Sequence, residues 1–407
     1  MTDVSTPDVS TPDVSSPDVG AALGTDFVGI AAEFGDEERD YLQRTRAFVD
    51  DEVLPEINGF WERAEFPVEL VRRMGELGLV SDGIDYPGVP SMTAASAGLV
   101  AMELSRGDGS LATFAGVQAG LTMRSIDYFG SEEQKQRWLP ALARCEALGA
   151  FALTEPDHGS DSLLLETSAV RDGDTYVLDG AKRWIGNGSI ADVVVVWARG
   201  EDGRVGGYLV EKGTPGYEAT VITGKGSVRA VWQADIALRD VRIPAENRLP
   251  GARSFKDTGK VLAGTRSQCA FSALGHAVAA YDAALTYASQ RTQFGKRLVE
   301  FQLVQARLVH MLQEVVGMQL FCMRLAQLHQ KGELNDTVAS LAKLNNTSKA
   351  RQICLEARDL LGGNGILLDN HVMRHLADVE AIHTYEGTET IQTLLVGRDI
   401  TGVGAFA

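Results

Sequence analysis

Apolar side chains recur with a spacing near 3.6 residues from about residue 36 to residue 149, which predicts a helical first region. Tyr41, Phe48 and Val49 form one apolar face, and a second face runs through residues 68–77. Residues 94–104 are small and apolar almost throughout, which predicts a buried helix. Two start signals accompany these patterns, because Pro67 stands where a helix begins and Ser131 is a good N-cap residue.

From about Phe151 the pattern changes to short β-branched runs separated by turn-forming pairs, which is typical of strands. The runs cover residues 176–178, 193–197, 208–210 and 234–243. The turn pairs are Asp172-Gly173, Asp179-Gly180, Asp202-Gly203 and Pro215-Gly216. Residues 151–248 therefore predict a small β domain.

After Pro250-Gly251 the helical period returns and continues to a glycine stop at Gly362-Gly363. One expected apolar stripe of this region consists of Val309, Leu312, Val316, Leu320 and Met323. The predicted fold is mainly α with a central β domain. Its parts are an N-terminal helical domain at 34–150, a middle β domain at 151–248 and a C-terminal helical domain at 249–407.

The N-terminal segment has a different composition. It repeats Ser/Thr-Pro-Asp-Val from Ser5 to Val19, and such a sequence buries too little apolar surface to offset the entropy of ordering. It also lacks the basic start and apolar stretch of a secretory signal. We expect residues 1–33 to form a flexible tail rich in proline and aspartate.

Charge and cysteine content narrow the class of protein. The chain of 407 residues has a formal net charge of -17, which disfavours nucleic acid as a partner. No apolar run is long enough to span a bilayer. The four cysteines, Cys145, Cys269, Cys322 and Cys354, are widely separated and form no CxxC pair, so a reducing cytoplasm is expected.

Polar segments near the predicted domain junctions are candidates for a binding site. Residues 154–161 offer hydroxyls and backbone amides, although an ordinary capped loop has the same composition. Residues 182–188 place Trp184 before small residues, which suits a flat ligand, although a buried tryptophan usually belongs to a core. In residues 291–295, Arg291 and Phe294 suit a pyrophosphate, although a surface helix end is the simpler interpretation.

The strongest candidate joins residues 361–365 to Tyr385-Glu386-Gly387-Thr388 about twenty residues later. Glycines around a lone carboxylate let a ligand approach it and let backbone N–H groups bond a carbonyl oxygen. Proton abstraction next to a carbonyl requires this arrangement. The simpler alternative is that Glu386 caps a helix.

Other catalytic constellations are not supported. His371 and His375 have the spacing of a zinc pair, but Val372 stands where the metalloprotease pattern needs glutamate, so no metal site is predicted. There is no GxGxxG after a strand and no Gly-x-Ser-x-Gly elbow.

In this order, the four segments resemble the acyl-CoA dehydrogenase family from about Asp36 to Phe406. Residues 385–388 and 397–402 resemble its glutaryl-CoA dehydrogenase branch. Residues 61–67, 182–187 and 248–251 resemble the plant peroxisomal short-chain acyl-CoA oxidase. The resemblance implies a three-domain subunit that ends in a four-helix bundle, assembles as a homotetramer, and binds FAD between domains and against a neighbouring subunit.

The resemblance also implies roles for particular residues. Glu386 is the catalytic base that removes the α-proton, and N5 of FAD accepts the β-hydride. The residues implied in FAD binding are Leu153, Thr154, Trp184, Ile185, Gly186, Arg291, Phe294, Gln302, Gly362, Gly363, Thr388 and Thr390. The residues implied in binding acyl-CoA are Ser160, Arg266, Tyr385 and Gly387. Some branches of the family place the base on a distant helix, but the matching position here is Thr265, which has no carboxylate.

Two departures bear on the substrate. Ala112 stands where the glutaryl branch has an arginine, so a short unsubstituted acyl-CoA is expected, with the trans-2-enoyl-CoA as product. Gly186 stands where many dehydrogenases have a threonine, as in the oxidase branch. Electron-transferring flavoprotein and O2 are therefore alternative acceptors. The alternatives are an acyl-CoA oxidase, a glutaryl-CoA dehydrogenase and a non-catalytic acyl-CoA or flavin-binding protein, against which the intact Glu386 argues.

Overall fold

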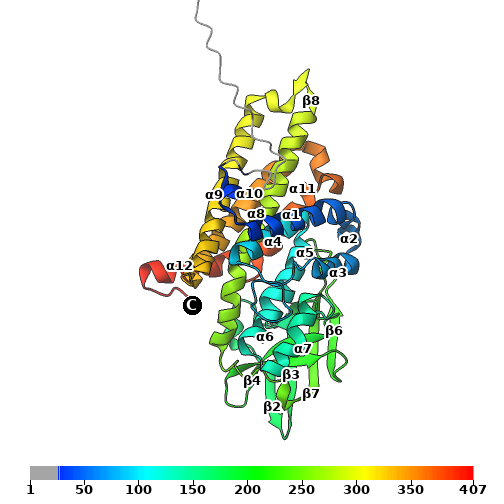
Figure 1. The fold of residues 1–407 in the computed structure, drawn as a ribbon, viewed down its shortest axis with the longest axis vertical. Helices are drawn as coiled ribbons and strands as arrows, with labels where there is room; N and C mark the ends of the chain where they lie inside the picture. Colours follow the sequence, from blue (N-terminus) through cyan, green and yellow to red (C-terminus); the bar gives the residue numbers. More distant parts are fainter. Residues whose placement is uncertain (1–25, 27, 407) are drawn as a thin grey trace, which may run out of the picture.

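The computed structural model describes residue 26 and residues 28–406. Helices, then strands, then helices follow one another along the chain, which confirms the predicted mainly helical fold with a central β region (Figure 1). Most of the predicted flexible tail, residues 1–33, lies outside the described residues. The prediction is wrong for the last part of this segment, because Ile30–Glu33 forms a 3-10 helix and the Ile30 side chain is buried in the core of the C-terminal helices. An apolar residue with a place to pack is ordered there despite its position near the chain end.

The first helical region begins with α1 and ends with α7. Its helices are α1 (Asp36–Phe48), α2 (Ile57–Arg63), α3 (Val68–Glu76), α4 (Ala94–Gly107), α5 (Gly109–Ala115), α6 (Arg124–Phe129) and α7 (Glu132–Ala143), with π-helical turns at Val49–Val53 and Gly116–Met123. Both expected start signals are present: Pro67 precedes α3, and Ser131 caps α7 in a capping box with Gln134. The expected buried helix is α4, whose N-cap is Thr93.

The strands form a mixed sheet of seven, in the order β1-β4-β2-β3-β7-β6, with β5 paired to β4. They are β1 (Gly149–Ala152), β2 (Ser168–Asp172), β3 (Thr175–Gly186), β4 (Val193–Gly200), β5 (Val205–Glu211), β6 (Tyr217–Val221) and β7 (Gln233–Pro244). One predicted turn is wrong, because Asp179-Gly180 lies within β3 at a register shift against β7. Gly180 is needed there for close packing, since a Cβ atom would lie 2.6 Å from the Thr167 hydroxyl oxygen.

The C-terminal region consists of long helices and a small hairpin. The elements are α8 (Phe255–Gln290), β8 (Thr292–Gln293), β9 (Lys296–Arg297), α9 (Gln302–Gln330), α10 (Asp336–Leu360), α11 (Val372–Thr384) and α12 (Glu389–Thr401), with short 3-10 helices at Leu298–Glu300, Gly362–Ile366 and Leu368–Asn370. Two other 3-10 helices, Ser162–Leu164 and Ala245–Asn247, belong to the middle region. The hairpin lies at the end of the molecule opposite the sheet, and α12 projects from one side (Figure 1).

The apolar stripe predicted for α9 is not the buried one. Val309 is 64% exposed and Leu320 is 54% exposed. The buried stripe is the neighbouring one, which consists of Leu308, Met311, Val315, Met318, Cys322 and Leu325. Both stripes have helical spacing and both are apolar, so periodicity alone does not tell which one faces α8 and α10.

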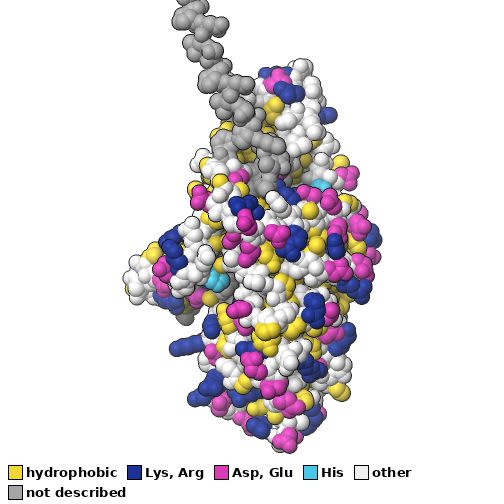
Figure 2. All heavy atoms as spheres, viewed as in Figure 1, with side chains coloured by type: hydrophobic (Ala, Val, Ile, Leu, Met, Phe, Trp, Pro, Cys, Tyr) yellow, Lys and Arg dark blue, Asp and Glu magenta, His cyan; other side chains and the backbone are white. Residues whose placement is uncertain are grey.

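The long helix α8 connects the parts of the fold, because it packs against α4 on one side and α10 on another. On the face that Figure 2 shows, acidic and basic side chains are interspersed, with no large area of one sign. Within residues 26 and 28–406, no helix is long and apolar enough to cross a membrane.

Candidate active site

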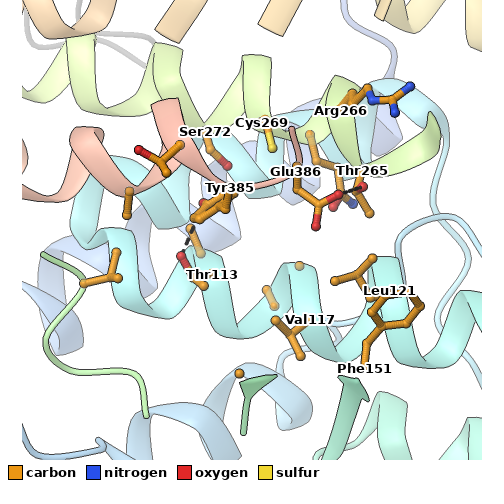
Figure 3. A pocket seen from close by; sticks show the side chains of 18 of the residues that line it. Thr113, Val117, Leu121, Phe151, Thr265, Arg266, Cys269, Ser272, Tyr385 and Glu386 are labelled. Atoms are coloured by element: carbon orange, nitrogen blue, oxygen red, sulfur yellow. Dashed lines mark hydrogen bonds between the residues drawn. The ribbon is translucent and has the colours of Figure 1, made fainter. Parts of the chain in front are cut away.

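A cavity of about 740 Å³ lies where the N-terminal helices, the sheet and the C-terminal helices meet. Its walls come from α4, α5 with the following π-helical turn, the ends of β1 and β3, α8, and the segment between α11 and α12. The Glu386 carboxyl group points into this space, between α8 and the helix that carries Val117 and Leu121 (Figure 3). The cavity therefore brings a carboxylate into an apolar space between domains.

The segment between α11 and α12 has an unusual backbone. The φ angle is 55° at Glu386 and 87° at Gly387. A non-glycine residue in this region costs about 1–3 kcal/mol, so surrounding contacts must hold it. Gln392 supplies two of them, since its Nε2 donates to the carbonyl oxygens of Glu386 at 2.9 Å and Gly387 at 3.0 Å. The alternative that Glu386 caps a helix is wrong, because Thr388 caps α12 by accepting from the Ile391 N–H at 3.3 Å.

The Glu386 carboxylate has one direct hydrogen-bond partner among the described residues. The Thr265 hydroxyl of α8 donates to Glu386 Oε2 at 2.6 Å. Burial in the cavity wall raises the pKa of Glu386, while the Thr265 hydrogen bond and the charges of Lys343 and Arg266 oppose that rise. A raised pKa makes the carboxylate a better acceptor for a carbon-bound proton.

The cavity collects most of the residues that the sequence singled out. Those that line it are Leu153, Thr154, Ser160, Trp184, Ile185, Gly186, Arg266, Tyr385, Glu386, Gly387 and Thr388. They come from segments more than two hundred residues apart, which is why no local pattern groups them. Tyr385 Oη lies 3.4 Å from the Thr113 hydroxyl at one side of the cavity (Figure 3).

Other implied cofactor residues do not line the cavity of this single chain. They are Arg291, Phe294, Gln302, Gly362, Gly363 and Thr390. Arg291 and Phe294 lie at the β8–β9 hairpin, far from the sheet (Figure 1), and the Phe294 side chain is 95% exposed. Within one chain, Arg291 and Phe294 therefore lie apart from Glu386 and from Trp184.

Two other carboxylates near the site have structural partners. Glu155 pairs with Lys182 at 2.8 Å, and both side chains are almost fully buried. Glu389 pairs with His383 at 2.9 Å. Neither carboxylate lines the cavity, whereas Glu386 does.

Sequence reasoning missed Lys343 and undervalued Thr265. Lys343 is 1% exposed on α10, and its Nζ donates to the carbonyl oxygens of Tyr385 and Gly387. A signal exists in the sequence, because Lys343 lies on the same helical face as Ala339 and Ala350, which are both buried. A lysine on a buried helical face requires a polar partner.

Comparison with known proteins agrees with this architecture. Models of the acyl-CoA dehydrogenase N-terminal, middle and C-terminal domains match residues 35–146, 150–241 and 255–401. A probable acyl-CoA dehydrogenase of Bacillus subtilis is 35% identical over 377 residues, which cover 90% of this chain and 99% of the relative. The mitochondrial short-chain specific acyl-CoA dehydrogenase of Bos taurus is 34% identical, with 87% of each chain covered.

Solved structures give the same result. The chain is similar to a glutaryl-CoA dehydrogenase from Mycobacterium smegmatis, with a TM-score of 0.92, 41% identity, and 94% and 99% of the two chains covered. It is also similar to butyryl-CoA dehydrogenase from Megasphaera elsdenii, with a TM-score of 0.85, 29% identity, and 90% and 98% covered. The chain belongs to the acyl-CoA dehydrogenase family of FAD-dependent oxidoreductases.

The cavity fits the flat ring system of FAD, the cofactor of this family. Trp184 has a φ of 63° and is 52% exposed although it lines the cavity, so its indole is available as an aromatic wall. Gly159 and Gly226 have no atom within 4 Å of a Cβ position, which leaves bare backbone open to a ligand. A related structure, of a Mycobacterium smegmatis glutaryl-CoA dehydrogenase, is a complex with FADH2.

Proposed function

We propose that this protein catalyses α,β-dehydrogenation of a short-chain acyl-CoA to the trans-2-enoyl-CoA, with Glu386 as the base that removes the α-proton. The observation that carries the proposal is the Glu386 carboxylate, which points into an apolar cavity and is held by Thr265 at 2.6 Å. FAD, when bound, supplies the acceptor for the β-hydride. Leu153, Thr154, Trp184, Ile185 and Gly186 line the part of the cavity in which its ring would lie.

The chain's own groups account for proton removal. An α-proton of a thioester is too weakly acidic for a carboxylate unless the carbonyl oxygen accepts hydrogen bonds that strengthen as enolate charge develops. The Glu386 N–H donates to no described group, so it is the expected donor to the thioester carbonyl. The raised pKa of Glu386 favours transfer of the proton to its carboxylate. Arg266, at the cavity wall, and Ser160 are proposed contacts of the CoA arm.

The acyl group is proposed to be short and without a terminal carboxylate. Ala112 lines the cavity where a dicarboxylyl substrate would need a cation. Of the cations that line this cavity, Lys225 donates through its Nζ to the Val228 and Val231 carbonyls, and Arg266, which lies 3.4 Å from Asp336, is the proposed contact of the CoA arm. The similarity to a glutaryl-CoA dehydrogenase supports the alternative substrate, and Gly186 supports the alternative of an oxidase that uses O2.

The functional unit is proposed to be a homotetramer in the cytoplasm. The implied FAD residues Arg291, Phe294, Gln302, Gly362, Gly363 and Thr390 do not line the cavity, so a second copy would have to supply those that hold the diphosphate and adenosine. Exposed apolar side chains on α9, such as Val309 and Leu320, support such an assembly. The four described cysteines are free and buried, in keeping with a reducing compartment.

We expect a yellow oligomer in size-exclusion chromatography with light scattering. A colourless monomer would contradict the assignment.

The electron acceptor is proposed to be an electron-transferring flavoprotein, with O2 as the alternative. A chain from a structural study of the electron transferring flavoprotein of Acidaminococcus fermentans has a similar fold, with a TM-score of 0.86 and 29% identity, which associates the fold with flavin-based electron transfer. Production of hydrogen peroxide during turnover, compared with reduction of a flavoprotein acceptor, decides between the two.

The test of the base is Glu386→Gln, which keeps the size and the backbone N–H but removes the proton acceptor. FAD content and acyl-CoA binding are expected to persist. Bleaching of the flavin by butyryl-CoA, followed by stopped-flow absorbance, should slow by about 10²–10⁴-fold or more. The matched control is Glu389→Gln, whose carboxylate pairs with His383 and should leave the rate near that of the parent. Bleaching of the Glu386→Gln variant at close to the parent rate would place the base elsewhere.

A further inference from the structure

We infer that Lys343 is a positioning residue for proton abstraction: it holds the Tyr385 and Gly387 carbonyls so that the Glu386 N–H and carboxylate both face the substrate. Its Nζ donates to both carbonyl oxygens, which flank Glu386 in the chain. The inference rests on the proposed role of Glu386 as base and adds a residue that touches neither substrate nor cofactor.

Peptide geometry connects Lys343 to the substrate side. In a trans peptide the C=O and the following N–H point in opposite directions. The Tyr385 C=O accepts a hydrogen bond from Lys343 of α10 and so points toward that helix. The Glu386 N–H, on the other side of the same peptide, therefore points away from α10. The same argument applies to the Glu386 C=O, which Gln392 holds at 2.9 Å, and to the Gly387 N–H. Neither N–H has a partner in the described part of the chain, and both residues line the cavity.

The segment needs this restraint because its backbone is strained. Glu386 has a φ of 55°, a region that glutamate seldom occupies. Lys343 is 1% exposed, so its ammonium group has lost water and depends on the two carbonyl oxygens for hydrogen bonds. Without Lys343, the Tyr385 carbonyl would lose its donor and the Gly387 carbonyl would keep only Gln392, so less would hold the segment against relaxing toward commoner backbone angles.

The charge of Lys343 acts on Glu386 as well. The ionisable groups around the carboxylate are Arg266 and Cys269 of α8, Lys343 of α10, and Tyr385. Burial raises the pKa of Glu386, and Lys343 and Arg266 lower it. Arg266 is engaged with Asp336 at 3.4 Å, whereas Lys343 has no carboxylate partner among the described ion pairs. Loss of Lys343 should therefore raise the pKa of Glu386.

The experiment compares Lys343→Met, Lys343→Arg and the control Lys349→Met in the FAD-loaded enzyme. Lys349 lies on the same helix but pairs with Glu314 at 3.0 Å. We expect flavin bleaching by butyryl-CoA to slow by about 10²-fold in Lys343→Met, a loss typical of misplaced catalytic groups. The acid limb of its rate against pH should move to higher pH, because the base must be ionised to act. Lys343→Arg should restore part of the rate, and Lys349→Met should match the parent.

A second readout does not depend on turnover. Infrared difference spectra of bound crotonyl-CoA, labelled with 13C at the thioester carbonyl, report hydrogen bonds to that oxygen. In the parent and in Lys349→Met the carbonyl band should shift to lower frequency on binding, and this shift should shrink in Lys343→Met. A merely structural role for Lys343 would lower the melting temperature but leave the shift and the pH profile of the folded fraction unchanged. That result would overturn the inference.

The outcomes separate this inference from the proposed function. If Glu386→Gln bleaches like the parent, the proposed base is wrong whatever Lys343 does. If Glu386→Gln is inactive while Lys343→Met keeps the parent pH profile and carbonyl shift, only the role of Lys343 is wrong. Should Lys343→Met fail to fold with FAD, Lys343→Gln takes its place, since it keeps a neutral donor. A parent-like pH profile in that variant would refute the electrostatic part.

Discussion

Replacing Lys182 with methionine removes the cation from a buried ion pair beside the cavity. Lys182 Nζ lies 2.8 Å from Glu155 Oε1, with side chains that are 0% and 4% exposed. Lys182 also donates to the Leu153 carbonyl at 3.0 Å, so the pair fixes the segment that carries Leu153 and Thr154 to β3. The change therefore tests how much the ion pair stabilises the fold and whether it holds the segment of Leu153 and Thr154, against which we expect the cofactor to lie.

The expected loss of stability depends on the hydrogen-bond donors that Glu155 keeps once Lys182 is removed. The Glu155 carboxylate also accepts from the Glu166 N–H at 2.6 Å and from the N–H and hydroxyl of Thr167 at 2.9 and 2.5 Å. Burial alone would raise the pKa of Glu155, but Lys182 and these donors lower it to about 2. Burial lowers the pKa of Lys182 to about 8, because the charge of Glu155 and its hydrogen bond compensate only part of the lost hydration. Both groups are thus ionised at pH 7, and removing one partner costs about 3–5 kcal/mol.

The assay is urea unfolding at saturating FAD, followed by circular dichroism. Lys182→Met should lose about 3–5 kcal/mol, and adding Glu155→Gln should recover much of it, since the carboxylate no longer lies buried without a cation. The control is Lys212→Met, whose pair with Asp192 is 66% and 36% exposed and should contribute no more than about 1 kcal/mol. The reasoning fails if Lys182→Met behaves like Lys212→Met, or if the double variant is no more stable than Lys182→Met.

Two further predictions concern catalysis. Thr265→Val removes a hydrogen bond that favours the ionised form of Glu386, so the pKa of Glu386 should rise and the acid limb of the bleaching rate, which increases with pH, should move to higher pH. An unmoved limb in stopped-flow profiles would show that this hydrogen bond does not tune the base. Butyryl-CoA should be a much better substrate than glutaryl-CoA, because Ala112 offers no cation to a buried carboxylate. Efficient release of CO2 from glutaryl-CoA would mean that Arg106 or Arg124 leaves its present partners, Glu103 and Asp82 respectively, to supply the charge.

The order of helices, strands and helices was predictable because it depends on local periodicity. A spacing near 3.6 residues marks α1 to α7 and α8 to α12, and β-branched runs between turn pairs mark the strands. Capping residues such as Ser131 were predictable for the same reason, since their hydrogen bonds span only a few residues. Where two local patterns were equally good, as for the two apolar stripes of α9, only the packing against α8 and α10 selected the buried one.

The candidate site depends on contacts between distant segments. The glycines around Glu386 and their likeness to a known family marked the carboxylate in the sequence. The contact of Glu386 with Thr265 spans 121 positions, and that of Tyr385 with Lys343 spans 42 positions. Thr265 carries no local signal of its partner, and the buried helical face of Lys343 indicates that the lysine needs a polar partner but not which one. Their roles were decided by the tertiary structure, because burial removes water from both side chains and leaves the Glu386 segment as their hydrogen-bond partner.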